Sequence, residues 1–178
     1  EDGIGLTVSA GLFDDVPNAV IVPGADNAVV VQTASGLGVS DNGDTTTDID
    51  GFGDNDALIF AFDQTVKLEG VWFSNVDLDD DVDFFYEVGA DLVRQPDLLG
   101  ITLALDGLLD FAVYVGLFPT FDKAWLTATK FGFGADDAGL LGILADNFKI
   151  AKIKVSGIDA PEVPIPAAAP LFMAGLAG

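Results

Sequence analysis

The chain has 178 residues, half of them hydrophobic, and carries 29 acidic against 7 basic residues, a net charge of −22. This charge excludes nucleic acid as a partner, because phosphate backbones are bound by clustered Lys and Arg. The chain has no Cys and no His, which excludes disulfides, thiol or imidazole catalysis, and metal sites built from those side chains. The length suits one domain with a buried core.

The charge is unevenly distributed along the chain. Residues 1–122 hold 24 acidic residues against Lys67 and Arg94, whereas residues 123–178 hold five acidic residues and five lysines and are neutral. Two interpretations stay open. The acidic part is either a solvated surface or a set of cation sites, with the C-terminal part forming a complementary basic face.

Strand signals dominate the chain, and they are separated by turns rich in Gly and Asp. Ten short strands are expected, at residues 4–9, 28–33, 36–40, 58–62, 65–75, 82–88, 100–105, 109–116, 125–133 and 148–155. Short helices are expected at residues 89–95 and 137–144. This pattern predicts an all-β fold, a β-sandwich or jelly roll.

Two strand features are specific enough to test. Residues 58–62 are apolar on both faces, which is typical of a central strand covered on each side. The Asp63-Gln64 turn is expected to join them to residues 65–75 as a hairpin. Later in the chain, the apolar phase shifts between Ile150 and Ala151, which indicates a β-bulge.

The C-terminal segment differs in kind from the rest of the chain. From residue 160 it is rich in Pro and then in small apolar residues, and the prolines favour an extended linker. The chain therefore divides into a β domain, residues 1–158, and an extended Pro-rich apolar tail, residues 159–178. No run of about 18 uncharged apolar residues is present to span a bilayer.

Residues 163–178, with the sequence VPIPAAAPLFMAGLAG, resemble the start of a PEP-CTERM sorting signal. The resemblance is to the VPLPA variant, with Ile165 in place of the usual Leu. Such signals continue with an apolar segment and a basic cluster; here the apolar segment stops early and the basic cluster is absent. The body is similar to the β-sandwich common among these proteins at residues 36–39, 48–51, 56–62 and 148–155.

The resemblance implies a bacterial protein exported by a Gram-negative host, with its signal peptide removed. It implies a destination at the cell surface or in the extracellular matrix, and processing by an exosortase-type transpeptidase. Membrane association is then expected only through the sorting signal before processing. No particular activity is implied.

Two groups of Asp residues are candidate metal ligands. The first comprises Asp41, Asp44, Asp48, Asp50, Asp54 and Asp56; the second comprises Asp77, Asp79, Asp81 and Asp83. Calcium takes six to eight hard oxygens, and loops of Asp, Asn and Gly supply them, so we predict a Ca²⁺ site in the first group. An EF-hand is excluded by the missing Glu at the twelfth position. A solvated loop stays the alternative.

The second group is expected in an extended segment, with its four carboxylates on one outer face. Asp80 is then expected on the opposite, inward face, which it shares with Leu78, Val82 and Phe84. Four like charges in a row repel each other unless cations or solvent screen them. A wet outer face is the alternative to a cation site.

Sugar binding needs an exposed aromatic platform, and Trp125 is the candidate for it. Trp72 lies in an expected strand and is predicted to be a core residue, as are the 14 Phe residues. A glycoside hydrolase would need two carboxylates held across a cleft, and the sequence marks no such pair. We therefore predict that the protein is not an enzyme.

The leading functional hypothesis is a self-assembling structural protein. The assembly residues are Val163, Pro164, Ile165, Pro166, Leu171, Phe172, Met173 and Leu176, with Lys149, Lys152 and Lys154 facing an acidic surface of the next copy. Burying the four large apolar side chains of the tail contributes on the order of 6–10 kcal/mol to association before ordering costs. These are Leu171, Phe172, Met173 and Leu176. A head-to-tail contact of this kind produces a homo-oligomer or filament. The alternatives are a calcium-dependent exopolysaccharide-binding module and, less favoured, a glycoside hydrolase.

Overall fold

The structure is a computed structural model that describes residues 3–42, 46–52, 54–76, 80, 82–95, 108–110, 123–135 and 146–158. Its strands are β1 (Leu6–Phe13), β2 (Val22–Pro23), β3 (Val29–Gln32), β4 (Leu37–Ser40), β5 (Ile49–Asp50), β6 (Asn55–Ser74), β7 (Asp83–Val88), β8 (Asp91–Arg94), β9 (Leu108–Asp110), β10 (Thr127–Gly134) and β11 (Asn147–Gly157). Two short 3-10 helices are η1 (Ala25–Asn27) and η2 (Lys123–Leu126). The all-β prediction is confirmed.

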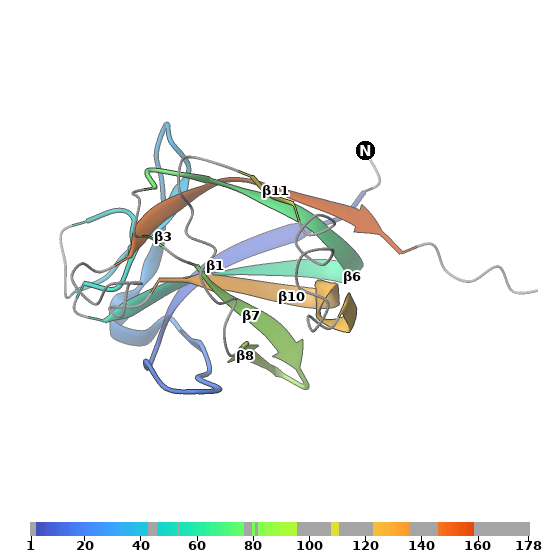
Figure 1. The fold of residues 1–178 in the computed structure, drawn as a ribbon, viewed down its shortest axis with the longest axis horizontal. Helices are drawn as coiled ribbons and strands as arrows, with labels where there is room; N and C mark the ends of the chain where they lie inside the picture. Colours follow the sequence, from blue (N-terminus) through green and yellow to red (C-terminus); the bar gives the residue numbers. More distant parts are fainter. Residues whose placement is uncertain are drawn as a thin grey trace, which may run out of the picture.

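Strand β6 is 20 residues long and organises the whole sheet. Its first part, residues 55–62, pairs with β1 and also contacts β10, whereas residues 66–74 pair with β11 and residues 70–72 with β9. All these pairings are antiparallel, and the central strand order is β3-β4-β11-β6-β10-β7-β8. Figure 1 shows the result as two layers that meet where β6 bends from one to the other.

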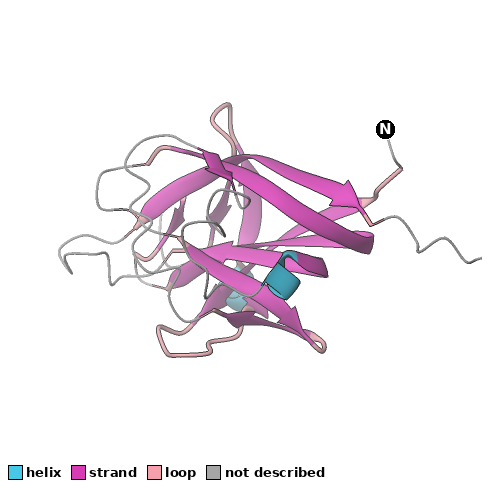
Figure 2. Ribbon diagram, turned by 45° about the vertical axis from the view of Figure 1, so that its right-hand side comes forward, coloured by secondary structure: helices cyan, strands magenta, loops and turns pink. Residues whose placement is uncertain are grey.

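The expected hairpin at Asp63-Gln64 is wrong. Residues 63–65 are exposed polar residues within β6, at the place where pairing with β1 ends and pairing with β11 begins, while β10 pairs with β6 on both sides of them. Here polar residues mark a bend that carries one strand between two layers, and the chain does not reverse. The sheet is thus continuous through β6 (Figure 2), and the finer expectation of a sandwich or jelly roll stays a prediction.

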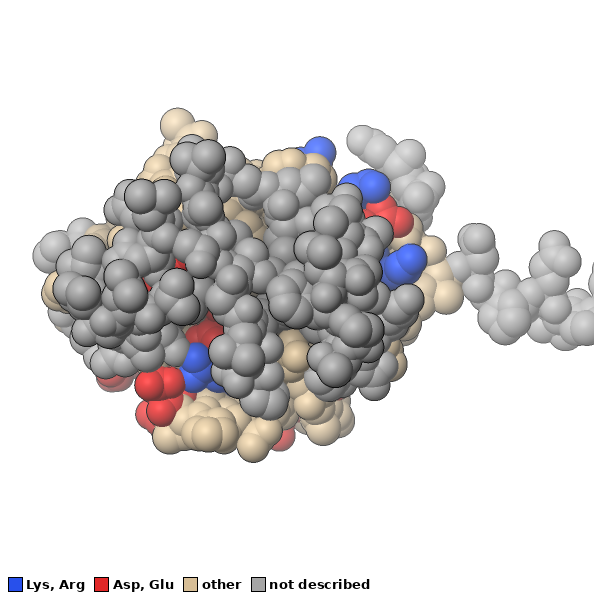
Figure 3. Space-filling model, in the orientation of Figure 1, with Lys and Arg blue, Asp and Glu red and all other residues tan. Residues whose placement is uncertain are grey.

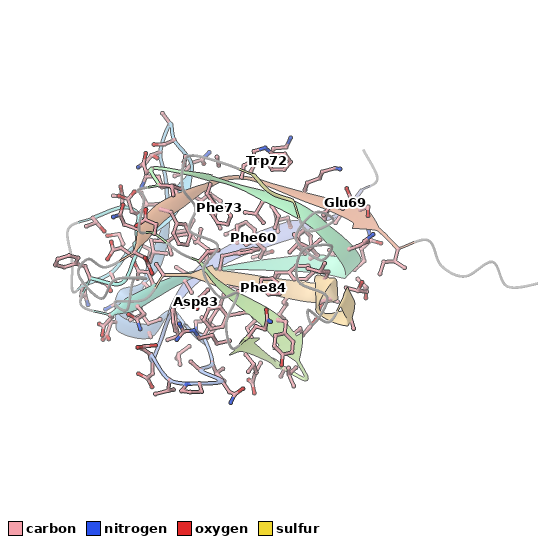
Figure 4. The ribbon with its side chains drawn as sticks, viewed as in Figure 1. Phe60, Glu69, Trp72, Phe73, Asp83 and Phe84 are labelled. Atoms are coloured by element: carbon pink, nitrogen blue, oxygen red, sulfur yellow. The ribbon has the colours of Figure 1, made fainter. Side chains whose placement is uncertain are left out.

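Phenylalanine rings fill the space between the two layers. Phe73, from the second part of β6, lies 5.3 Å from Phe148 of β11 and 6.3 Å from Phe133 of β10, measured between ring centroids. Phe60 and Phe84 reach the same Phe133 ring from β6 and β7. Edge-to-face aromatic pairs of this kind add to the free energy of area burial. Figure 4 shows Phe60, Phe73 and Phe84 in this interior.

A second, smaller apolar cluster lies on the other face of the first part of β6. It contains Phe13, Ala19, Ile21, Ala57, Ile59, Phe85 and Leu92. Leu58, Phe60 and Phe62 face the main core, while Ala57 and Ile59 face this cluster. The prediction of a central strand that is covered on both faces is therefore confirmed.

Two further local predictions have clear outcomes. The register of β11 against β6 shifts between Ile150 and Lys152, which confirms the β-bulge. The helix expected at residues 89–95 is wrong, because Asp91–Arg94 form β8, which pairs with β7 across a turn with Gly89 at φ 65°. Cross-strand pairing with the apolar residues of β7 outweighs the weak helix pattern. The helix expected at residues 137–144 lies outside the described residues.

Candidate functional site

The first part of β11 carries a buried cation. Lys149 is only 3% exposed, and its Nζ lies 2.5 Å from Oδ1 of Asp48. The ammonium also donates to the backbone carbonyl of Thr47 and, at 3.1 Å, to the Thr47 hydroxyl. Lys149 was expected to face an acidic surface of another copy together with Lys152 and Lys154. This is wrong for Lys149, because residues 46–48 cover it and bind its charge within the chain.

Glycine at position 38 of β4 allows residues 46–48 to lie this close. A Cβ atom there would lie 1.9 Å from the carbonyl oxygen of Thr47, which no side chain tolerates. The Val39 N–H donates to the carbonyl of Asp48 at 3.1 Å, which fixes the segment against β4. The position of the Asp48 carboxylate over β11 thus depends on Gly38 of β4, which has no side chain to push residues 46–48 away.

Asp50 of the first predicted metal group is a buried acceptor of hydrogen bonds. It is 2% exposed, and its Oδ1 accepts the Phe52 N–H at 2.8 Å while its Oδ2 accepts the Thr46 hydroxyl. These bonds hold the turn that follows β5 and present the Phe52 ring, 69% exposed, to solvent. Phe52 is thus an exception among the described Phe residues, which were expected in the core.

The other described members of the first group are spread over different surroundings. Asp41 is half-buried after β4, Asp54 is exposed, and Asp56 is completely buried in β6, where its backbone carbonyl accepts the Ala135 N–H. Among the residues that the structure describes, no three Asp or Glu side chains come together as a metal site. Asp44, Asp77, Asp79 and Asp81 lie outside those residues, so the Ca²⁺ site stays a prediction.

The described residues of the second group and its neighbours have structural contacts. Asp80 is 2% exposed and accepts the Asn147 N–H at 3.0 Å, at the start of β11. Val82 and Phe84 are buried with it, which confirms the inward face for these three residues. Asp83 of β7 binds Nε of Arg94 at 2.7 Å.

Arg94 joins three parts of the chain on the side of β7 and β8. Its Nη1 lies 2.6 Å from Oδ1 of Asp15, and its guanidinium carbon lies 5.6 Å from the Phe13 ring centroid. A guanidinium offers several donors in a fixed plane, so one Arg can bind two carboxylates and stack on a ring. This arrangement secures the loop after β1 and is structural in character.

The outer face of β6 and β11 is the part of the described surface where an aromatic ring and several cations lie together. Lys152 is paired with Trp72 in the ladder, and its Nζ lies 4.3 Å from the Trp72 ring centroid. Lys154 binds Glu69 at 2.6 Å. Figure 4 shows Trp72 and Glu69 on the outer side of this layer, with Phe73 pointing inward.

Trp72 was expected in the core, and that prediction is wrong. The ring is only partly buried, because its neighbours Val71 and Phe73 face inward and the alternation of a strand turns position 72 outward. Trp125, the predicted glycan platform, lies in η2, but its side chain lies outside what the structure describes. The tail residues of the predicted assembly contact, 163–178, also lie outside it.

The Glu69 carboxylate has a shifted titration. The hydrogen bond from Lys154, and then one from Ser156, lowers the pKa of Glu69 below its usual range, and the charges of Lys154 and Lys67 add to the effect. Glu69 therefore stays ionised to a lower pH than an ordinary glutamate and neutralises one of the lysines on this face.

Comparisons of the chain with protein-family models, curated proteins and solved structures find no match. Within the described residues, no helix is long and apolar enough to cross a membrane. Function must therefore be argued from the residues themselves.

Sequence reasoning missed the two ion-pair networks around Lys149 and Arg94. Their partners are far away in sequence: Thr47 is 102 positions from Lys149, and Asp15 is 79 positions from Arg94. The one signal available was chemical, since a chain with so few cations and so many acids gives each cation several possible partners. The sequence does not indicate which of these partners lies close.

Proposed function

We propose that the protein is a structural component of the bacterial cell surface or extracellular matrix that assembles with copies of itself through its C-terminal tail. The observation that carries the proposal is the resemblance of residues 163–178 to a PEP-CTERM sorting signal. The same segment is almost free of polar side chains, so its exposure to water is unfavourable and its burial against a neighbour is favourable.

The described body is compatible with a role as a stable acidic module. Its buried ionisable groups hold loops and strands in place: Lys149 secures residues 46–48, Asp80 secures the start of β11, and Arg94 secures the loop after β1. The body ends with β11 at Gly157, followed by the exposed Ile158. The tail, residues 159–178, therefore follows the end of a strand in the sequence.

Removal of the tail tests this proposal. We expect the full chain to sediment as an oligomer and a chain ending at residue 162 to sediment as a monomer with unchanged far-UV circular dichroism. Substitution of Leu171 and Phe172 by Ser is a matched control that keeps the chain length. Equal oligomerisation of the truncated and full chains, or a monomeric full chain at every concentration, would refute the proposal.

We further propose that Ca²⁺ stabilises the body, as predicted from the first Asp group. An ion that binds only the folded state stabilises it by about 2.7 kcal/mol when its free concentration is about 100 times its Kd. A chelator should then lower the melting temperature, and Asp44→Asn should reduce that effect while Lys130→Gln, a substitution on β10 outside both Asp groups, leaves it intact. A melting temperature that is the same in calcium and in chelator would exclude this role.

A hydrolase is the least favoured function. Asp50 and Asp80 each accept a backbone N–H, which supports a role of these buried carboxylates in holding loops, and the sequence marks no acid and base pair. We expect no turnover of polysaccharide or peptide substrates. Turnover that a single Asp→Asn substitution abolishes would contradict this expectation.

A further inference from the structure

The outer surface of the β11 layer gathers cations on an acidic protein. The Trp72 face is defined here as Lys67, Glu69 and Trp72 of β6 with Lys152, Lys154 and Ser156 of β11. It holds three of the seven basic residues of a chain whose net charge is −22. Figure 3 shows blue side chains gathered around one red group at this end of the molecule.

Among the described side chains, charge on this face is only partly neutralised. Lys154 binds Glu69 and keeps 58% of its side chain exposed. Lys67 is exposed on the adjoining strand, and Lys152 lies over the Trp72 ring. Among the described side chains of this face, three cations against one carboxylate leave a local positive excess. Because the rest of the chain is acidic, this excess acts only over short distances, within a Debye length of about 8 Å at physiological salt.

The Trp72 ring makes the face more than a group of lysines. A large, partly exposed aromatic ring on an outer sheet face, with the Lys152 ammonium over it, offers a flat apolar surface with polar groups at its edge. A cation held over a ring that is partly open to solvent is held weakly. A ligand with its own flat C–H surface and its own anion can replace it, taking the ring while Lys152 pairs with the anion.

We propose that the Trp72 face binds a carboxylated polysaccharide. The sugar ring stacks on Trp72, and the carboxylates of successive sugar units pair with Lys152, Lys154 and Lys67. Lys152 and Lys154 are two positions apart on one strand, which separates them by about 7 Å. This spacing suits a polymer that carries a negative charge at regular intervals.

A second copy of this chain fits the same face less well. Antiparallel pairing of two β11 strands would bring lysines opposite lysines, which is unfavourable. An acidic protein surface offers carboxylates but no flat sugar ring for Trp72. Self-association through this face is therefore an outcome that the test must separate from glycan binding. The residues of the face all precede position 159, so the inference does not depend on assembly through the tail.

Titration of the full chain with sodium alginate, followed by calorimetry and by affinity electrophoresis, tests the inference. We expect binding at about 0.05 M salt that weakens by at least about ten-fold at about 0.2 M salt, because ion pairs with the polymer replace bound counterions. Neutral dextran should not bind. Polyglutamate, which has the charge without the sugar ring, should bind more weakly than alginate.

Substitutions separate the ring from the charges. Trp72→Ala should weaken alginate binding by about ten-fold or more, in the range of aromatic contacts at binding sites. Lys152→Gln combined with Lys154→Gln should abolish binding at the higher salt. Lys130→Gln, on β10 of the other layer, is the matched control and should leave binding within about two-fold. Circular dichroism and unfolding of each variant confirm that it folds.

Three results would overturn the inference. The first is the absence of alginate binding at the lower salt. The second is equal binding of alginate by the Trp72→Ala, double-lysine and control variants. The third is a change in sedimentation of the double-lysine variant without any change in alginate binding, which would assign the face to a contact between copies.

Discussion

Strand β11 carries three lysines, and its two ends use them in opposite ways. At the first end, Lys149 is buried and bound to Asp48 and Thr47. At the second end, Lys152 and Lys154 are exposed on the outer face. The residue type, the strand and the partner strand β6 are the same. The difference arises because residues 46–48 cover the first end.

The comparison shows how burial decides the role of a charge. A buried ammonium must keep its partners, because an unpaired charge in the protein interior is costly. An exposed ammonium is hydrated whether or not it has a partner, so its ion pair contributes little to stability and its charge is available to a ligand. Substitutions at the buried end should therefore change the free energy of unfolding, and substitutions at the exposed end should change the affinity for a ligand.

The largest effect is expected from Asp48→Asn. This substitution removes the counter-charge of Lys149 and leaves a buried ammonium, so the free energy of unfolding should fall by about 3–5 kcal/mol. Denaturant unfolding measures this change. Asp54→Asn is the matched control, since Asp54 is exposed in the same part of the chain, and it should change stability by less than about 0.5 kcal/mol. Equal effects of the two substitutions would show that the ion pair between Asp48 and Lys149 does not stabilise the fold.

Gly38→Ala should have the second largest effect on the free energy of unfolding. The added Cβ meets the Thr47 carbonyl, so residues 46–48 must move away from β4, at a cost of about 1–3 kcal/mol. Gly157→Ala is the control, because a Cβ at that position has open space around it. Hydrogen exchange at the Val39 amide, which binds the Asp48 carbonyl, should accelerate in the first variant only. An unchanged exchange rate would contradict the close contact between Gly38 and the Thr47 carbonyl.

Lys149→Met should destabilise less than Asp48→Asn. Methionine keeps apolar volume in the buried position, and Asp48, whose side chain is 27% exposed, can be hydrated after the lysine is lost. The free energy of unfolding should fall by about 1.5–3 kcal/mol, the range for a lost hydrogen bond to a charged group. The double variant Asp48→Asn with Lys149→Met should lose less than the sum of the two single variants. Strict additivity would mean that the two residues do not act as a pair.

The sequence predicts those features of β11 and β6 that depend on local pattern. The apolar phase shift at Ile150 predicts the bulge, and the apolar residues 58–62 predict a strand that is covered on both faces. Both follow from the two-residue period of a strand. The hairpin predicted at residues 63–64 is wrong, because polar residues that suit a turn also suit a bend at the edge between two layers. Local pattern does not distinguish the two.

The sequence does not predict which charges are buried. Lys149 and Lys152 have similar neighbours in the sequence, and the loop that separates their roles lies 102 positions away. For Trp72, strand alternation places the ring on the face opposite Val71 and Phe73, but it does not tell whether another layer covers that face. Contacts between residues far apart in the sequence decide whether these side chains are covered, and local periodicity does not predict such contacts.

The smallest effect is expected at the exposed end, from Glu69 and Lys154. Because the hydrogen bond from Lys154 lowers the pKa of Glu69, this pair contributes stability above the unfolded pKa of a glutamate. That contribution is lost as the pH falls through the lower folded pKa. Glu69→Gln at neutral pH should change unfolding much less than Asp48→Asn, since exposed pairs are well screened.

The titration of Glu69 is the sharper measurement at this end. Carbon-detected NMR should place its folded pKa below the usual glutamate value, and Lys154→Ala should raise it toward that value, while Lys130→Ala leaves it unchanged. High salt should reduce the shift, because screening weakens the interaction between exposed charges. A folded pKa at or above the usual value would mean that Lys154 does not stay within 2.6 Å of the carboxylate.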